Sequence, residues 1–263
     1  MGTHSLTADH PAFGGLSGIE IEDGALYAVT DQGWWLEADL SHGSVGIVPV
    51  NASLTPLLDT DGRGLDKNGG DAEGLAITAQ GAAISFERDH RVMWRQDDGR
   101  LANSVTHRAL ERLRSNSGLE ALAKLPDGRL VAIAEASRSG VHPMFAIEVD
   151  GTVRSGAFPT YRPYAITGAD MGPDGWFYVV LRHYTALTGV AVQIHRFLLD
   201  DAGLPVAESR DVVASFEGRG GIDNMEGIAV WQDATGRTRL AVVSDDNFRF
   251  IQRTLLMDLV VLD

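Results

Sequence analysis

The amino-acid sequence predicts an all-β protein, a five-bladed β-propeller built from four-stranded antiparallel blades around a central channel. Three observations lead to this class. The 263 residues include 30 glycines, and many Asp-Gly turns separate short runs of Val, Ile, Leu and Ala, which is typical of consecutive β-hairpins. A unit of similar pattern recurs five times. Its spacing is close to the roughly 50 residues of a four-stranded propeller blade.

The repeated unit consists of a small or acidic residue, an apolar run, a turn, a second apolar run and a charged residue. It occurs at residues 15–31, 71–87, 117–135, 165–182 and 224–245. Aligned on their turns, the copies share one register position, at successive intervals of 56, 47, 47 and 59 residues. That position holds Ser17, Glu73, Glu120, Thr167 and Glu226.

Each copy predicts the two inner strands of one blade. In the first, GLSGIEIEDGALYAVTD, the apolar runs flank Asp23-Gly24, and the third and fourth turn at Asp127-Gly128 and Asp174-Gly175. Asp and Gly suit these turns because they tolerate left-handed backbone angles. The second, DAEGLAITAQGAAISFE, and the fifth, NMEGIAVWQDATGRTRLAVVSD, keep the same order of runs. The stretch after each copy predicts two outer strands, for example residues 145–149 and 152–158.

The two ends and one connection complete the predicted architecture. Residues 106–115 favour a short helix. Residues 253–262 favour the third strand of the fifth unit, so we expect the residues before Gly14 to supply its outermost strand and close the ring. A closed ring leaves only short, protected sheet edges. Residues 1–263 then form a single propeller domain.

Composition limits the classes of partner. Asp and Glu number 36 against 22 Lys and Arg, a formal net charge of −14, which argues against a nucleic-acid-binding surface and favours a cation. No apolar run approaches the roughly 20 residues of a membrane helix. The chain contains no cysteine, which excludes disulfides, thiolate metal sites and a cysteine nucleophile. We expect a monomer that acts on a small molecule.

The shared register position predicts a first ring of side chains, because equivalent residues of successive inner strands converge on the channel. All five members offer oxygen atoms, and three carboxylates in a narrow channel repel one another. Either a carboxyl retains a proton or a cation binds. Oxygen ligands without His or Cys favour Ca²⁺, which accepts about 6–8 of them. The alternative is that these side chains hydrogen-bond exposed backbone at the strand starts. The expected calcium ligands are Ser17, Glu73, Glu120, Thr167 and Glu226.

A second ring is predicted after the second apolar run of each copy. A hairpin brings the start of its first strand and the end of its second to the same side, so both rings are expected on one face. Mixed acids and arginines there suit an anionic or ester substrate held against the metal. A network of salt bridges between blades is the alternative. The second ring comprises Asp31, Glu87, Glu135, Arg182 and Asp245, and the mouth is lined by Arg88, His183, Asp246, Asn247 and Trp34.

Five segments resemble the bacterial phytase-like family, which is also described as having the esterase-like activity of phytase. The match runs nearly end to end through FGGLSGIE (13–20), GDAEGLAI (70–77), SNSGLEALA (115–123), DNMEGIAVW (223–231) and VSDDNFRFIQRT (243–254). The resemblance implies hydrolysis of esters or phosphoesters. It also implies an exported bacterial protein with a periplasmic or extracellular location.

The first ring also resembles that of the calcium-activated nucleotidases. In these five-bladed propellers Ser, Glu, Glu, Ser and Glu from successive blades surround a central Ca²⁺. Four positions match that order, and Thr167 keeps a hydroxyl where the nucleotidases have Ser. The resemblance implies the metal cage alone, since the catalytic residues of the nucleotidases cannot be carried over.

These features predict a calcium-dependent hydrolase of phosphate esters or related esters. The expected base is Glu87, Glu135, Asp31 or Asp245, and Arg88 and Arg182 are expected to stabilise developing negative charge. The expected substrate contacts are His183, Asp246, Asn247 and Trp34. Two alternatives remain, a non-catalytic ligand-binding propeller in which calcium only joins the blades, and a lactonase.

Overall fold

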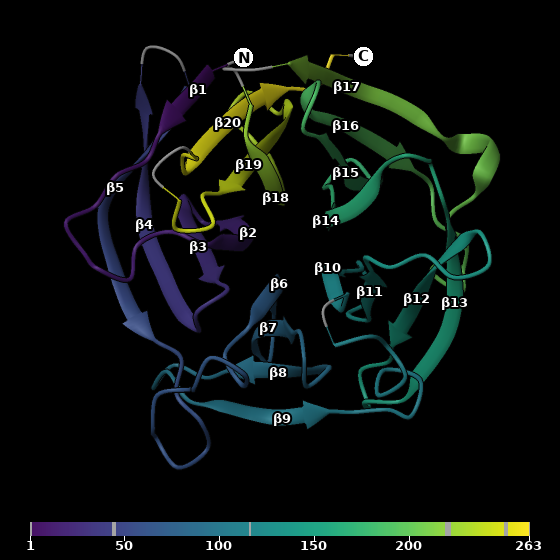
Figure 1. Ribbon diagram of the computed structural model, residues 1–263, viewed down its shortest axis with the longest axis horizontal. Coiled ribbons are helices and arrows are strands. Elements are labelled where there is room, and N and C mark those ends of the chain that lie inside the picture. Colours follow the sequence, from purple (N-terminus) through teal and green to yellow (C-terminus); the bar gives the residue numbers. More distant parts are fainter. Residues whose placement is uncertain (1, 44–45, 116, 219–221, 250–251, 263) are drawn as a thin grey trace.

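The protein is a five-bladed β-propeller in the computed structural model, which describes residues 2–43, 46–115, 117–218, 222–249 and 252–262 (Figure 1). Five sheets, each of four antiparallel strands, surround a common axis. The predicted fold class is therefore confirmed. Within the described residues, no helix is long and apolar enough to cross a membrane.

In every blade the repeated copy supplies the two innermost strands. Blade 1 contains β2 (Leu16–Glu22), β3 (Ala25–Thr30), β4 (Trp34–Gly43) and β5 (Gly46–Pro56). Blade 2 contains β6 (Ala72–Thr78), β7 (Gly81–Phe86), β8 (Arg91–Arg95) and β9 (Leu101–Val105). Blade 3 contains β10 (Leu119–Lys124), β11 (Leu130–Ala134), β12 (Val141–Ile147) and β13 (Val153–Pro159).

The fourth and fifth blades follow the same order from the axis outwards. Blade 4 contains β14 (Ala165–Met171), β15 (Phe177–Thr185), β16 (Gly189–Phe197) and β17 (Asp211–Gly218), with the 3-10 helix η1 (Ala207–Ser209) before β17. Blade 5 contains β18 (Asn224–Gln232), β19 (Thr238–Asp245), β20 (Leu255–Val260) and β1 (Gly2–Ser5).

The N-terminal strand closes the ring, as the sequence predicts. β1 pairs antiparallel with β20, from Gly2 opposite Asp258 to Ser5 opposite Leu255. Asp258 is 1% exposed, and its Oδ2 accepts a hydrogen bond from the Ile47 backbone N–H of blade 1 at 3.0 Å. The same carboxylate forms an ion pair with Arg239. Blade 5 is thus tied to blade 1 by one buried carboxylate as well as by strand pairing.

The hydrophobic core is divided into five clusters, one between each pair of neighbouring blades. Ile133 of blade 3 packs in the same cluster as Val179 of blade 4, and Val180 of blade 4 packs with Val242 of blade 5. The remaining three clusters fill the boundaries between blades 5 and 1, 2 and 3, and 1 and 2. Because burial of apolar surface drives folding, each blade is stabilised by both neighbours.

A β-bulge turns each inner strand at its first-ring position. The pairing register shifts between Leu16 and Ile19 in β2, between Ala72 and Leu75 in β6, and at the equivalent points of β10, β14 and β18. A bulge leaves a residue unpaired and re-aims its side chain. Every first-ring residue lies inside one of these bulges.

Glycine follows the first-ring position in four of the five blades, because the next inner strand passes too close for a side chain. A Cβ atom on Gly227 would lie 2.2 Å from the Ser17 carbonyl oxygen, and one on Gly168 would lie 2.3 Å from the Glu226 carbonyl oxygen. The close approach of the strands brings the ring residues of neighbouring blades together.

Two local predictions need correction. Residues 106–115 form turns and no helix, because a single i→i+4 bond, from the Glu111 N–H to the His107 carbonyl, is not continued into a second turn. The outer strands of blade 3 run over Val141–Ile147 and Val153–Pro159. They meet at a hairpin turn in which the Gly151 N–H donates to the Glu148 carbonyl.

Candidate metal centre and active site

Both predicted rings lie at one end of the channel. In blades 1 to 3, the backbone N–H of the second-ring residue donates to the carbonyl of the residue two before the first-ring position: Asp31 to Gly15, Glu87 to Asp71, and Glu135 to Gly118. In blades 4 and 5, Arg182 pairs with Ala165 and Asp245 with Asn224 at the same positions. The hairpins therefore place all ten side chains around one mouth.

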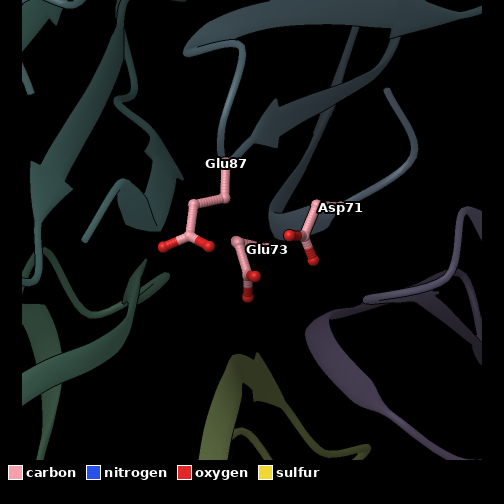
Figure 2. A group of neighbouring side chains, drawn as sticks. All are labelled: Asp71, Glu73 and Glu87. Atoms are coloured by element: carbon pink, nitrogen blue, oxygen red, sulfur yellow. The ribbon is translucent and has the colours of Figure 1, made fainter. Parts of the chain in front are cut away.

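Three carboxylates from blade 2 form a tight group, with Glu73 between Asp71 and Glu87 in Figure 2. One oxygen atom from each lies within 4.8 Å of the others, and among the described residues no other trio of His, Asp or Glu meets this separation. Asp71 is the residue before β6, Glu73 lies in the bulge within β6, and Glu87 is the residue after β7.

This trio fits a divalent cation by its chemistry and its spacing. Calcium–oxygen distances of about 2.3–2.6 Å allow two ligands of one ion to lie up to about 5 Å apart. All three donors are carboxylate oxygens, which hard cations prefer. Of these three residues, the sequence predicts Glu73 as a metal ligand and Glu87 as a candidate base, whereas Asp71 was missed. Its signal was its position two residues before Glu73, directly opposite Glu87 in the hairpin.

The hydroxyl residues of the first ring donate to backbone carbonyls. The Thr167 Oγ1 donates to the Met225 carbonyl of blade 5 at 2.9 Å, and the Ser17 Oγ donates to the Gly15 carbonyl at 3.5 Å. These bonds agree with the structural alternative considered for the ring. The bonds still leave oxygen lone pairs on both hydroxyls, because a hydroxyl carries two of them.

The first-ring glutamates repel one another inside the protein. Burial raises the pKa of Glu73 well above its usual value, and the charges of Glu226 and Asp71 raise it further. Burial likewise raises the pKa of Glu120, with a further contribution from Glu73. Without a cation, these carboxyls hold their protons to higher pH than an exposed glutamate.

Arg182 supplies a fixed positive charge to this acidic channel. Its Nη1 donates to the Oε1 of Glu226 and to the Oδ1 of Asn224 in blade 5. Its Nη2 lies 3.9 Å from the Oε1 of Glu135 in blade 3. Burial raises the pKa of Glu226 to about 8, and the Arg182 charge opposes that rise. Arg182 therefore makes the salt bridges between blades that were one of the two interpretations of the second ring.

Two second-ring carboxyls titrate near neutrality. Burial raises the pKa of Asp31 to about 7, and the charges of Asp245 and Asp71 contribute to the rise. The Asp31 Oδ1 is buried and makes no hydrogen bond within the described part of the chain. Burial also raises the pKa of Glu87 to about 7, although its Oε1 accepts a hydrogen bond from the Gly118 N–H at 3.2 Å.

Backbone geometry at Gly15 makes room for the Asp31 carboxyl. Gly15 has φ of +60°, and a Cβ atom there would lie 2.1 Å from the Asp31 Oδ1. A left-handed backbone at this point suits glycine because it lacks a Cβ atom. The Gly-Gly pair of the FGGLSG segment therefore has a role in the site.

The remaining second-ring acid and the loop after it are held by local hydrogen bonds. The Asp245 Oδ1 accepts from the Asn247 N–H at 2.6 Å, and burial raises the pKa of Asp245 to about 6. Asp246 accepts from the Gly15 and Phe248 backbone N–H groups, both at 3.1 Å. Asp246 thus braces the loop against blade 1.

Three further expected mouth residues lie at different parts of the rim. The Arg88 Nε donates to the Asp71 carboxylate, and the side chain is 36% exposed. The Trp34 ring lies 5.2 Å from the His10 ring, edge to face. His183 makes an edge-to-face contact with Tyr164 at 5.9 Å.

The fold and this acidic mouth define a five-bladed propeller protein whose channel carries a group of carboxylates able to hold a metal ion. A family model described as "Phytase-like: Esterase-like activity of phytase" matches residues 11–248, and the chain belongs to this family. No curated protein matches the chain.

Solved structures share the propeller fold at low sequence identity. The gluconolactonase XC5397 of Xanthomonas campestris is 16% identical, with 94% of this chain and 86% of that chain covered and a TM-score of 0.52. The α-L-arabinofuranosidase PaAbf62A of Podospora anserina is 9% identical, with 97% and 94% covered and a TM-score of 0.54. An exo-1,5-α-L-arabinanase from a bovine ruminal metagenomic library is 12% identical, with 97% and 96% covered and a TM-score of 0.52. At these identities the likeness concerns the fold alone.

Proposed function

We propose that the protein is a calcium-dependent hydrolase of phosphate esters or related esters that acts at this channel mouth. The observation that carries the proposal is the trio Asp71, Glu73 and Glu87, whose oxygen atoms lie within 4.8 Å of one another, beside Asp31. Membership of a family described by esterase-like activity supports the reaction class.

Asp71, Glu73 and Glu87 would hold the ion, and a preference for calcium is favoured by their oxygen-only donor set. When bound, the ion supplies a Lewis acid that polarises a phosphoryl or carbonyl oxygen. Within the first ring, Glu120 lies near enough to Glu73 for the charge of Glu73 to raise the pKa of Glu120. Ser17 and Thr167 are the remaining candidates for oxygen donors from the other blades.

Asp31 is the best-placed proton acceptor of the four expected bases. Glu87 is committed to the ion, the Asp245 carboxylate is hydrogen-bonded to Asn247 and Asn224, and Glu135 lies beside Arg182. Asp31 keeps a buried oxygen without a partner among the described residues. A base with a pKa near the working pH can accept a proton from an attacking water molecule and release it afterwards.

Arg88 is the better placed of the two expected arginines to meet an anionic substrate. One edge of its guanidinium holds Asp71, and the side chain remains 36% exposed. Its Nη1 also donates to the Asn68 Oδ1 at 3.4 Å, and Nη2 is left to donate to a phosphate or carboxylate oxygen, for which a guanidinium is suited. Arg182 instead holds Glu226 and Asn224 in position.

The test is a panel of aryl phosphates, nucleotides, aryl carboxylate esters and lactones, assayed with Ca²⁺ and with a strong chelator. We expect hydrolysis of at least one ester class with Ca²⁺ and a loss of at least tenfold on chelation. Glu87→Gln should remove activity while preserving the fold, and Glu111→Gln, an exposed residue, serves as the matched control. Undiminished hydrolysis in the chelator would contradict the proposal.

A non-catalytic binding propeller is the second candidate, and it is favoured by the residues that brace blades at the mouth. Thr167, Arg182 and Asp246 each connect two blades. In this case calcium removal lowers the melting temperature, no member of the panel is turned over, and Glu87→Gln changes ligand affinity alone. Turnover of lactones alone would instead indicate a lactonase.

A further inference from the structure

A cavity of about 520 Å³ opens at the opposite end of the channel from the candidate active site. Residues from the far ends of all five inner strands line it, so it lies on the propeller axis. One residue from each strand is Glu20, Ile77, Lys124, Asp170 and Val230.

The cavity extends outwards from the axis across the boundary between blades 1 and 5. Leu40 and His42 belong to β4, the third strand of blade 1, and Ile47 belongs to its outermost strand β5. Trp231 and Gln232 at the end of β18 form the facing wall. The site is therefore elongated, with an apolar wall leading away from the acidic end.

Two carboxyls lie at the axial end of this cavity, Asp170 buried and Glu20 partly buried. Asp170 is 5% exposed, and its two oxygen atoms accept hydrogen bonds from the Met171 and Val230 backbone N–H groups, both at 2.6 Å. Burial raises the pKa of Asp170 to about 7, and burial and the Asp170 charge raise the pKa of Glu20 well above its usual value. Both acids would be more stable ionised if a further positive charge entered.

The resident positive charge offsets the acids only in part, since the charge of Lys124 lowers the pKa of both Glu20 and Asp170 without cancelling the rise caused by burial. Lys124 lies in the same lining, yet it forms no ion pair within 4.0 Å of a carboxylate in the described part of the chain. Glu22 and Asp23, both exposed, add two carboxylates at the rim. Four acidic side chains therefore face one ammonium group, besides the exposed imidazole of His42.

We propose that this cavity binds a linear organic amine, with an ammonium end between Glu20 and Asp170 and its methylene chain against Trp231 and the neighbouring apolar wall. Charge-assisted hydrogen bonds to two carboxylates fix the ammonium. The Trp231 ring, which already has the Arg239 guanidinium 5.6 Å from its centroid, offers apolar surface to the methylene chain. A bare metal ion would leave the apolar wall unused. A neutral sugar would leave the excess negative charge uncompensated. The site is independent of the proposed hydrolase, because it lies at the other end of the channel.

Calorimetric titration of calcium-loaded protein with 1,4-diaminobutane and with spermidine tests this inference. Glu20→Gln and Asp170→Asn keep the size of each side chain, although Asn keeps only one of the two oxygens that accept backbone N–H groups at Asp170. Each variant should bind the amines at least about tenfold more weakly. Glu111→Gln, an exposed acid outside the cavity, should leave binding unchanged. Should Asp170→Asn fail to fold, the Glu20→Gln titration decides alone.

A variant with the opposite expected effect sharpens the test. Lys124→Met removes a repelling ammonium and should tighten amine binding several-fold, whereas Lys67→Met, outside the cavity lining, should not. Hydrolysis should be unaffected by Glu20→Gln, and amine binding should be unaffected by Glu87→Gln, which separates the two sites. Three outcomes would overturn the inference. They are equal weakening of amine binding by Glu20→Gln and Glu111→Gln, no binding at millimolar amine, and weaker amine binding in Lys124→Met.

Discussion

Replacing Asp31 by Asn should stabilise the calcium-free protein at neutral and alkaline pH. The side chain keeps its shape and loses the charge that its surroundings disfavour. Burial together with Asp245 and Asp71 raises the pKa of Asp31 from 3.8 to about 7. The folded state therefore binds this proton more tightly than the unfolded state, so the wild-type protein loses stability as the pH rises through this range.

The size of the effect follows from the two pKa values. One pKa unit corresponds to about 1.36 kcal/mol, so the difference between 3.8 and about 7 amounts to about 4 kcal/mol. This figure is an upper bound, because water at the channel mouth screens the charge. The advantage of Asp31→Asn should be absent below pH 3.8, grow between pH 4 and 7, and stay constant above pH 7.

Urea denaturation in a chelating buffer at pH 4.5, 6 and 8 measures this difference directly. Asp9→Asn is the matched control, since Asp9 is exposed, and it should show no such trend. Saturating Ca²⁺ should reduce the advantage at pH 8, because a nearby cation stabilises the ionised wild-type carboxylate. A variant that is less stable than wild type at pH 8, or equally shifted at pH 4.5 and 8, contradicts the assigned environment of Asp31.

Three other substitutions test the architecture and the metal centre. Gly227→Ala should lower the free energy of unfolding, measured in urea, by about 1–3 kcal/mol, because the new Cβ would lie 2.2 Å from a backbone oxygen. The control Gly64→Ala should change this free energy little, because the space around Gly64 is open. Asp258→Ala should lower the free energy of unfolding, measured by thermal unfolding, by about 3–5 kcal/mol, because it leaves a buried ion pair with one partner. Asp211→Ala, which removes one partner of a half-exposed ion pair, should lower it by at most about 1 kcal/mol. Glu73→Gln should weaken calcium binding at least about tenfold by calorimetry, since ligand charge sets affinity; unchanged calcium affinity would exclude Glu73 as a ligand.

The ring positions were accessible from the sequence because the propeller is periodic. Aligning the five copies on their turns identifies Glu73, Glu120 and Glu226 as equivalent, and each of them lies in a β-bulge. The Gly that follows in four copies was visible in the same alignment. Its reason, the close passage of the neighbouring inner strand, requires the packed ring.

The carboxylate trio was only partly accessible. Glu73 was expected as a metal ligand of the first ring and Glu87 as a base of the second ring, and Asp71 lies outside the repeated position. Side chains of one blade form the trio, because a hairpin places Asp71 opposite Glu87 with Glu73 two residues further along. Alignment across blades emphasises residues of different blades and overlooks partners within a single hairpin.

The sequence alone determined the number of blades, the strands that face the axis, the closing N-terminal strand and the acidic character of the mouth, since these depend on local turns and on repetition. Only the tertiary structure decided which acids meet, that Arg182 bonds to Glu226 and Asn224 and lies near Glu135, and that an acidic cavity opens around Glu20 and Asp170 at the other end of the channel. The physical reason is that side-chain pairing and pKa values depend on distances of a few ångströms between residues far apart in the chain. Periodicity places these residues around one axis, but it does not fix the distances between them.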